Sequence, residues 1–104
     1  MKQPLKNTRD MMIDICWKAG KDAELYARDE MIMHRYRRFR LGEDGIIYPG
    51  EGKEVKRGEL LKFLECLEQE DVRIMWVGAP EVPIEITHNE DHIVVVVWPR
   101  PYRY

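Results

Sequence analysis

The chain has 104 residues, the length of one domain, and its 44% hydrophobic and 35% charged residues exclude a wholly disordered protein. The net charge of −2 is unevenly distributed, because residues 34–40 carry four arginines and residues 100–104 two more, which leaves −8 on the rest. The chain therefore lacks the overall basic excess that is typical of a general electrostatic nucleic-acid binder.

The apolar segments and the cysteines indicate a soluble, cytoplasmic protein with no membrane partner. The longest apolar run, residues 93–98, is far shorter than the roughly 20 residues that a membrane-spanning helix needs. The first ten residues also lack the apolar stretch of a secretion signal. Cys16 and Cys66 each lie among apolar residues with a helical pattern, so we expect two buried free thiols and no disulfide.

The first predicted helix has apolar side chains on two sides. A polar residue at position 7 or 8 can cap it, and it runs to about Ala19, where Gly20 can end it. Ile13 and Trp17 form an apolar pair outside its main stripe. A helix of this kind is usually buried on two sides, either between another helix and a sheet or against a second subunit.

A second helix is predicted from Ala23 to about Leu41, with Asp22 as its cap and Gly42 as its end. Its acidic residues come first and its basic residues last, an order that complements the helix dipole. The acidic group is Glu24, Asp29 and Glu30, and the basic group is His34, Arg35, Arg37, Arg38 and Arg40.

The C-terminal half is predicted to combine strands with one amphipathic helix. Glycines and a proline between residues 42 and 58 indicate turns around a short strand at Gly45–Tyr48, and residues 58–69 have a clear helical period. Three strands follow. The second and third are predicted to form a hairpin. The third should be central in the sheet or covered, since both its faces are apolar. The three strands span residues 72–77, 83–87 and 93–98.

These elements predict a single α+β domain over residues 1–104, with a helical half at 1–42 and an α/β half at 43–104. Two N-terminal helices, a short strand and the amphipathic helix would precede a three-stranded, mostly antiparallel sheet. That sheet would pack on the helices.

Residues 34–40, HRYRRFR, combine basic and aromatic side chains as segments that bind phosphates and stack on bases do. Three interpretations stay open: a solvated helix end, a contact with an acidic protein, or a contact with nucleic acid. On a helix Arg28, Arg35 and Arg38 would share one side, whereas Arg37 and Arg40 would point elsewhere. The C-terminal residues add Arg100, Tyr102, Arg103 and Tyr104 in an extended form.

His88 and His92 are weak candidates for a metal site. They flank residues 89–91, which include two acids, and a hairpin could place the two imidazoles opposite each other. No third ligand is identifiable, so polar hairpin residues are the simpler interpretation and we predict no bound metal.

The lack of a recognisable catalytic constellation favours a non-enzymatic protein without a cofactor. The chain has no serine, and its two cysteines lie on apolar faces, where a thiolate is disfavoured. The first hypothesis is therefore a protein–protein interaction module, with a homodimer as one form, because Trp, Tyr and Arg commonly anchor interfaces. Its surface would use Ile13, Trp17, Arg28, Arg35, Arg38 and Arg40, together with Arg100, Tyr102, Arg103 and Tyr104.

Two alternatives are kept beside it. A single-stranded nucleic-acid-binding protein would use the arginines of segments 34–40 and 100–104, with Tyr102 or Tyr104 stacking on bases. A small metal- or histidine-dependent enzyme would be built on His88, His92 and nearby acids.

Overall fold

The computed structural model describes residues 8–76, 79–81, 83 and 85–97, which form an α+β fold of two helices and two small sheets. The helices are α1 (Thr8–Lys18) and α2 (Arg57–Glu65). One mixed sheet, sheet A, has the order β2 (His34–Tyr36), β1 (Glu24–Asp29), β8 (His92–Val97) and β7 (Glu85–His88). The other, sheet B, has the order β3 (Phe39–Leu41), β4 (Ile46–Pro49), β5 (Arg73–Trp76) and β6 (Ala79–Glu81).

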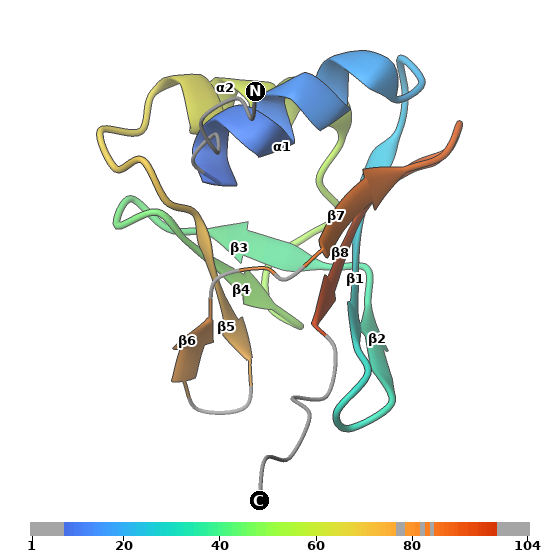
Figure 1. Ribbon diagram of the computed structural model, residues 1–104, viewed down its shortest axis with the longest axis vertical. Helices are drawn as coiled ribbons and strands as arrows, with labels where there is room; N and C mark the ends of the chain where they lie inside the picture. Colours follow the sequence, from blue (N-terminus) through green and yellow to red (C-terminus); the bar gives the residue numbers. More distant parts are fainter. Residues whose placement is uncertain (1–7, 77–78, 82, 84, 98–104) are drawn as a thin grey trace, which may run out of the picture.

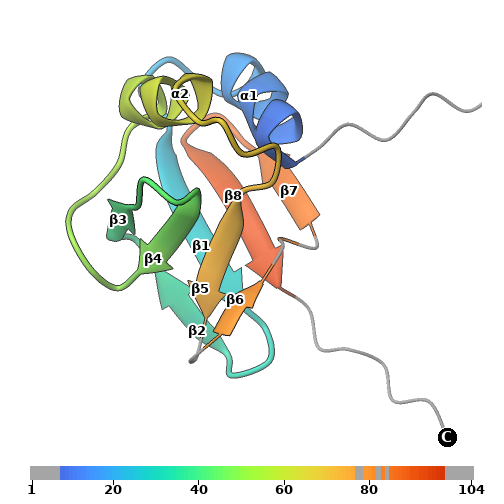
Figure 2. The same ribbon diagram turned by 90° about the vertical axis from the view of Figure 1, so that its left-hand side faces the viewer.

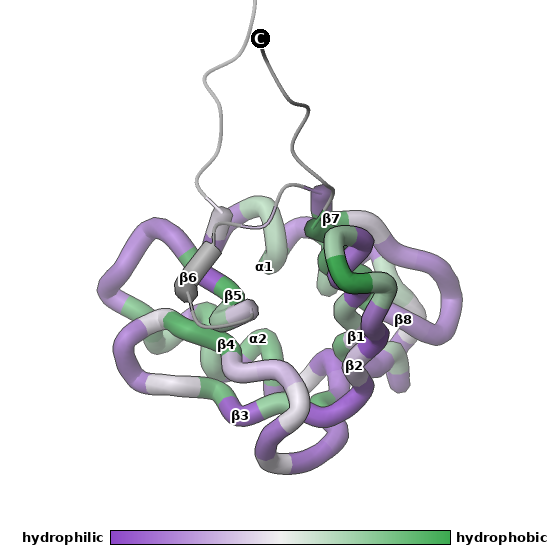
Figure 3. Tube along the Cα trace, turned by 90° about the horizontal axis from the view of Figure 1, so that it is seen from below, coloured by the Kyte–Doolittle hydropathy of each residue, from purple (hydrophilic) through white to green (hydrophobic). Residues whose placement is uncertain are grey.

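The two sheets stand opposite each other, and both helices cover one end of the space between them (Figures 1 and 2). Seen from the other end, the strands surround a common interior (Figure 3). That interior is filled by one apolar cluster to which both sheets and both helices contribute. Its largest fully buried members include Met12 of α1, Leu25 of β1, Phe39 of β3, Leu60 of α2 and Ile93 of β8.

Each sheet contains one parallel pair. In sheet B, α2 lies between the parallel strands β4 and β5 in the sequence, as a parallel connection requires. In sheet A, β1 runs parallel to β8 along its whole length, from the pair Glu24 and His92 to the pair Asp29 and Val97. The first and the last of the described strands are therefore direct neighbours.

The predicted second helix is wrong, because its residues form β1, β2 and β3. Burial in β1 alternates with period two: Leu25, Ala27 and Asp29 are buried, whereas Tyr26 and Arg28 are partly exposed. The order of acidic and basic residues lowers the free energy of a helix by only about a few tenths of a kcal/mol per charged group. Pairing with the buried strand β8 outweighs that preference, so residues 8–42 contain one helix and strands of both sheets.

The rest of the predicted order is closer to the structure. The first helix, the amphipathic helix and the short strand before it are confirmed as α1, α2 and β4. The hairpin of β7 and β8 and the central position of β8 are also confirmed. The single three-stranded sheet is wrong, because the predicted strand at 72–77 became β5 of sheet B, apart from the other two.

The two cysteines differ in their surroundings. Cys16 of α1 is fully buried, as predicted, but Cys66 at the end of α2 is exposed. Both are free thiols. Within the described ranges, no helix is long and apolar enough to cross a membrane.

Candidate functional site

A groove with basic and aromatic walls surrounds β2, and we call it the β2 groove. Its cavity volume is about 360 Å³, within the range of roughly 300 to 1,000 Å³ that small-ligand pockets occupy. β2 is an end strand of sheet A. Tyr36 faces the interior beside Ala27, whereas Tyr26 of the neighbouring strand β1 faces outward. The groove therefore wraps around the edge of β2. The lining residues are Tyr26, His34, Arg35, Tyr36, Arg37, Arg38 and Gly50.

Aromatic rings form the inner wall of the groove. The His34 and Tyr36 ring centroids are 4.6 Å apart, and the Tyr36 ring lies 5.9 Å from that of the buried Trp76. Gly50 has a positive φ of 86° and leaves the Tyr36 ring uncovered, because a Cβ at this position would contact the ring at 3.7 Å. Burial, and then the nearby Asp29 carboxylate, raises the pKa of Tyr36 above its ordinary value.

The outer wall is formed by Tyr26 and the arginine next to it. Tyr26 packs against His92 with ring centroids 5.4 Å apart, and the Arg37 guanidinium lies 5.8 Å from the Tyr26 ring centroid. A cation at this distance from a ring face is weakly attracted to it. The contact keeps Arg37 near the groove without neutralising its charge.

The arginine charges of the groove have few acidic neighbours. Arg38 Nη2 donates a hydrogen bond of 2.8 Å to the Gly52 carbonyl oxygen, and the Gly50 N–H donates one of 2.8 Å to the Arg38 carbonyl, which holds this corner in place. Arg35 and Arg37 are exposed and form no ion pair with another residue that the structure describes. No aspartate or glutamate is among the lining residues.

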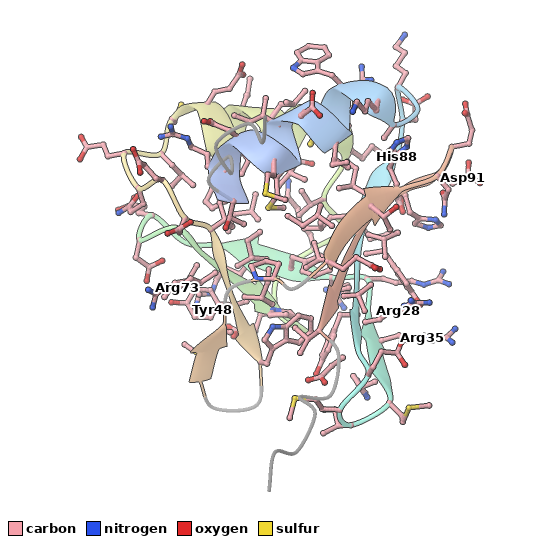
Figure 4. The ribbon with its side chains drawn as sticks, in the orientation of Figure 1. Arg28, Arg35, Tyr48, Arg73, His88 and Asp91 are labelled. Atoms are coloured by element: carbon pink, nitrogen blue, oxygen red, sulfur yellow. The ribbon has the colours of Figure 1, made fainter. Side chains whose placement is uncertain are left out.

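Arg28 lies beside the groove rather than in it. Its Cα is paired with that of Arg35 across β1 and β2, and both side chains point outward from sheet A (Figure 4). Arg28 Nε lies 3.3 Å from Glu30 Oε1. Strand pairing thus places Arg28 and Arg35 next to each other. The predicted helix also placed them on one side, but through helical spacing and not through pairing of strands.

Arg40 is directed away from the β2 groove. Its guanidinium lies 3.9 Å from the centroid of the Tyr48 ring, and its Nε lies 3.2 Å from Glu51 Oε1. The Tyr48 hydroxyl donates to Asp44 Oδ2 at 3.0 Å, and this hydrogen bond is the main reason that the pKa of Tyr48 is raised. Arg40 is therefore held in an acidic environment of its own.

The other predicted partner-binding residues are far from the groove or outside the described residues. Trp17 of α1 is 61% exposed, whereas Ile13 is partly buried and packs against the core. Figure 1 shows α1 at one end of the molecule and the turn of β1 and β2 toward the other. Arg100, Tyr102, Arg103 and Tyr104 lie outside the described residues.

The two histidines do not form the predicted facing pair. His88 is paired with Ile93, which points into the core, so the adjacent His92 lies on the opposite face and packs against Tyr26. Asn89, not His88, is opposite His92, and its N–H donates to the His92 carbonyl at 3.0 Å. Across the described ranges, no group of three or more potential ligands is placed to hold a metal ion.

Sequence reasoning singled out the basic segment but grouped its members incorrectly. Arg37, which a helix would point elsewhere, lines the groove with Arg35 and Arg38, and Arg40 does not. Tyr26 and Gly50 were missed, although the alternation of apolar residues in 24–29 and the Pro–Gly turn at 49–50 signal a strand and a tight turn.

Comparison with known proteins finds no family model, no curated protein and no solved structure that this chain matches.

Proposed function

We propose that the protein is a non-enzymatic binding module and that the β2 groove binds single-stranded nucleic acid. One observation carries the proposal: three arginines, a histidine and two tyrosines line the same groove, with no carboxylate among the lining residues of a chain whose net charge is −2. Arginine binds phosphate through a planar fork of donors, and aromatic rings stack on any base.

Nucleic acid fits this lining better than an acidic peptide does. An acidic peptide would use the arginines, but its anionic carboxylates would be repelled by the negative faces of the aromatic rings that line the groove. Each base stacked on an aromatic side chain contributes about 1 to 3 kcal/mol. A cavity of about 360 Å³ suits one unstacked base better than a paired duplex.

The number of arginines in the groove sets how steeply the binding affinity should fall as the salt concentration rises. If Arg35, Arg37 and Arg38 neutralise three phosphates, log K for a single strand should fall with log salt with a slope of about −2. Fluorescence anisotropy of a short labelled single strand, titrated from low to physiological salt, measures this slope. A slope near zero would contradict phosphate contacts in the groove.

The test of the site compares two double charge reversals. Arg35→Glu with Arg37→Glu removes two exposed arginines of the groove, and Lys21→Glu with Lys62→Glu makes the same change of net charge at exposed positions elsewhere. The groove variant should lose at least tenfold in affinity, and the control should lose severalfold at most. Equal losses in the two variants would show that binding is a general effect of net charge and would overturn the proposal.

A second candidate function is binding to another protein, or to a second copy of this chain, through α1. It is supported by the exposed apolar side chains of this helix. Trp17 is 61% exposed and Met11 42%, and the Arg57 guanidinium lies 5.4 Å from the centroid of the Trp17 ring. Trp and Arg together are frequent anchors of protein interfaces. Light scattering should give a dimer mass that Trp17→Ala reduces to the monomer mass, and a monomer for both proteins would contradict self-association.

A further inference from the structure

The turn between β1 and β2 presents three consecutive large apolar side chains to solvent, and we call residues Met31–Met33 the hairpin tip. Met31 is 59% exposed, Ile32 50% and Met33 80%. Single exposed apolar residues are common on protein surfaces, whereas a contiguous group of them marks a contact surface.

The backbone of the hairpin tip is fixed by the fold. Asp29 is 3% exposed, and its Oδ1 accepts hydrogen bonds from the N–H groups of Met31 at 2.9 Å and Ile32 at 3.4 Å. Glu30 N–H donates to the Val97 carbonyl at 2.8 Å, which ties the turn to β8. Met33 has a φ of +57°, a conformation that is strained for a side chain of this kind. A buried carboxylate thus holds the backbone of the turn at Met31 and Ile32.

The hairpin tip is continuous with the β2 groove. Met33 is followed directly by His34, whose ring lines the groove 4.6 Å from the Tyr36 ring. Arg35 stands on the next position of the same strand, with no ion-pair partner among the described residues. Because successive side chains of a strand point to opposite faces, a ligand that wraps around the edge of β2 and extends past His34 meets apolar and cationic groups in succession.

Nucleic acid complements both kinds of group, because its backbone is anionic and the faces of its bases are apolar. Methionine and isoleucine are among the residues that minor-groove proteins insert between base steps of duplex DNA, and the same apolar contact can separate stacked bases of a single strand. Methionine sulfur also makes favourable contacts with aromatic rings. The preformed turn would make such an insertion without ordering a loop first.

We infer that the hairpin tip is a wedge that separates the base held in the β2 groove from its stacked neighbour. This inference rests on the proposed function of the groove. Beyond that function, the wedge would make the protein separate stacked bases of the bound strand and not only contact its phosphates.

The test uses a single strand that carries 2-aminopurine, whose fluorescence rises when it unstacks. Binding of the unaltered protein should raise this fluorescence where 2-aminopurine is the neighbour of the base held in the groove, because that neighbour loses its stacking partner. Ile32→Ser with Met33→Asn should remove most of the rise and weaken binding about tenfold or less, and asparagine is chosen because it tolerates the left-handed backbone at position 33. Gln69→Ser, at an exposed position after α2 that belongs to neither proposed surface, is the control and should change neither signal.

The outcomes separate the two proposals. Arginine-dependent binding without a rise in fluorescence, or a rise that the tip variant retains, overturns the wedge and leaves the groove as the binding site. The absence of any binding that depends on Arg35 and Arg37 overturns the proposed function and the wedge with it. A tip variant that changes the oligomeric mass and not the fluorescence assigns the hairpin tip to a contact between copies and also overturns the wedge.

Discussion

At the scale of single residues, buried polar and ionisable groups maintain the local geometry. Asp29 illustrates this most clearly, because its carboxylate is almost fully buried and yet satisfies two backbone N–H groups of the turn that follows. A buried carboxylate without such partners would be strongly unfavourable. The same side chain that completes the buried face of β1 therefore also ends the strand and shapes the hairpin tip.

Cys16 gives a prediction about pH and reactivity. Burial raises the pKa of its thiol to about 12, although the nearby Arg57 charge opposes the shift. Because the thiolate is the reactive form, Cys16 stays protonated and inert at pH 8, whereas the exposed Cys66 can react. Mass spectrometry after alkylation at pH 8 should find one adduct on the folded protein and two in denaturant.

A matched variant identifies the labelled residue. Cys66→Ala should take up no label while folded and one label when unfolded. Labelling of the folded Cys66→Ala protein at a rate near that of a free thiol would show that Cys16 is accessible and that its pKa is not raised.

At the scale of elements, tight turns hold the strands around the groove. Gly52 has a φ of +75°, and a Cβ there would collide with the Phe39 carbonyl oxygen, in the region where Phe39 and Lys53 exchange backbone hydrogen bonds. The Gly52 carbonyl also accepts the hydrogen bond from Arg38. This one glycine therefore joins the geometry of β3 to the position of a groove arginine.

Gly52→Ala should lower the free energy of unfolding by about 2 kcal/mol, because a left-handed backbone and a backbone collision are both unfavourable for alanine. Urea denaturation measures the change. Gly58→Ala in α2 is the control, since a Cβ there meets no atom within 4 Å and alanine favours the helix. It should leave stability unchanged or raise it by up to about 1 kcal/mol, and equal losses at both glycines would contradict the argument.

Local patterns predicted those elements whose structure is decided locally. The period of residues 58–69 and the glycines around residues 45 and 50 are sufficient to predict α2 and the strand before it. β1 and β2 were missed because the order of charges in residues 24–40 favours a helix and outweighs the short alternation in 24–29, whereas the pairing of β1 with β8 and of β2 with β1 is not visible locally. The groove was missed as a group for the same reason, since Tyr26, Tyr36 and Gly50 meet only after the sheets have formed.

At the scale of the whole molecule, β8 connects the parts of sheet A. It is paired on both sides, parallel with β1 and antiparallel with β7, and residues Ile93 to Val97 are all buried. Both faces of the strand are thus shielded from solvent, which explains its apolar composition. The stability of the groove depends on this strand, because β2 is attached to the rest of sheet A through β1 alone.

Hydrogen exchange should show that β8 is the most protected strand of sheet A and that β2 is less protected. Amides of β8 and the amides of β1 that face it should exchange only when the whole domain unfolds, whereas those of the edge strand β2 should exchange sooner, since opening there exposes less apolar surface. Native-state exchange measured by NMR resolves each strand. Faster exchange in β8 than in β2 would show that sheet A opens at its centre and would contradict this order.

The parallel ladder of β1 and β8 has a consequence for synthesis of the protein. The ribosome makes β1 and β2 early, and these neighbours can pair as a hairpin at once, but β8 follows only at residues 92–97. Until then the second edge of β1 has no partner, and an open strand edge is a site for pairing with other chains. The time needed to synthesise residues 37–97 therefore contributes to how long each nascent chain is exposed to aggregation.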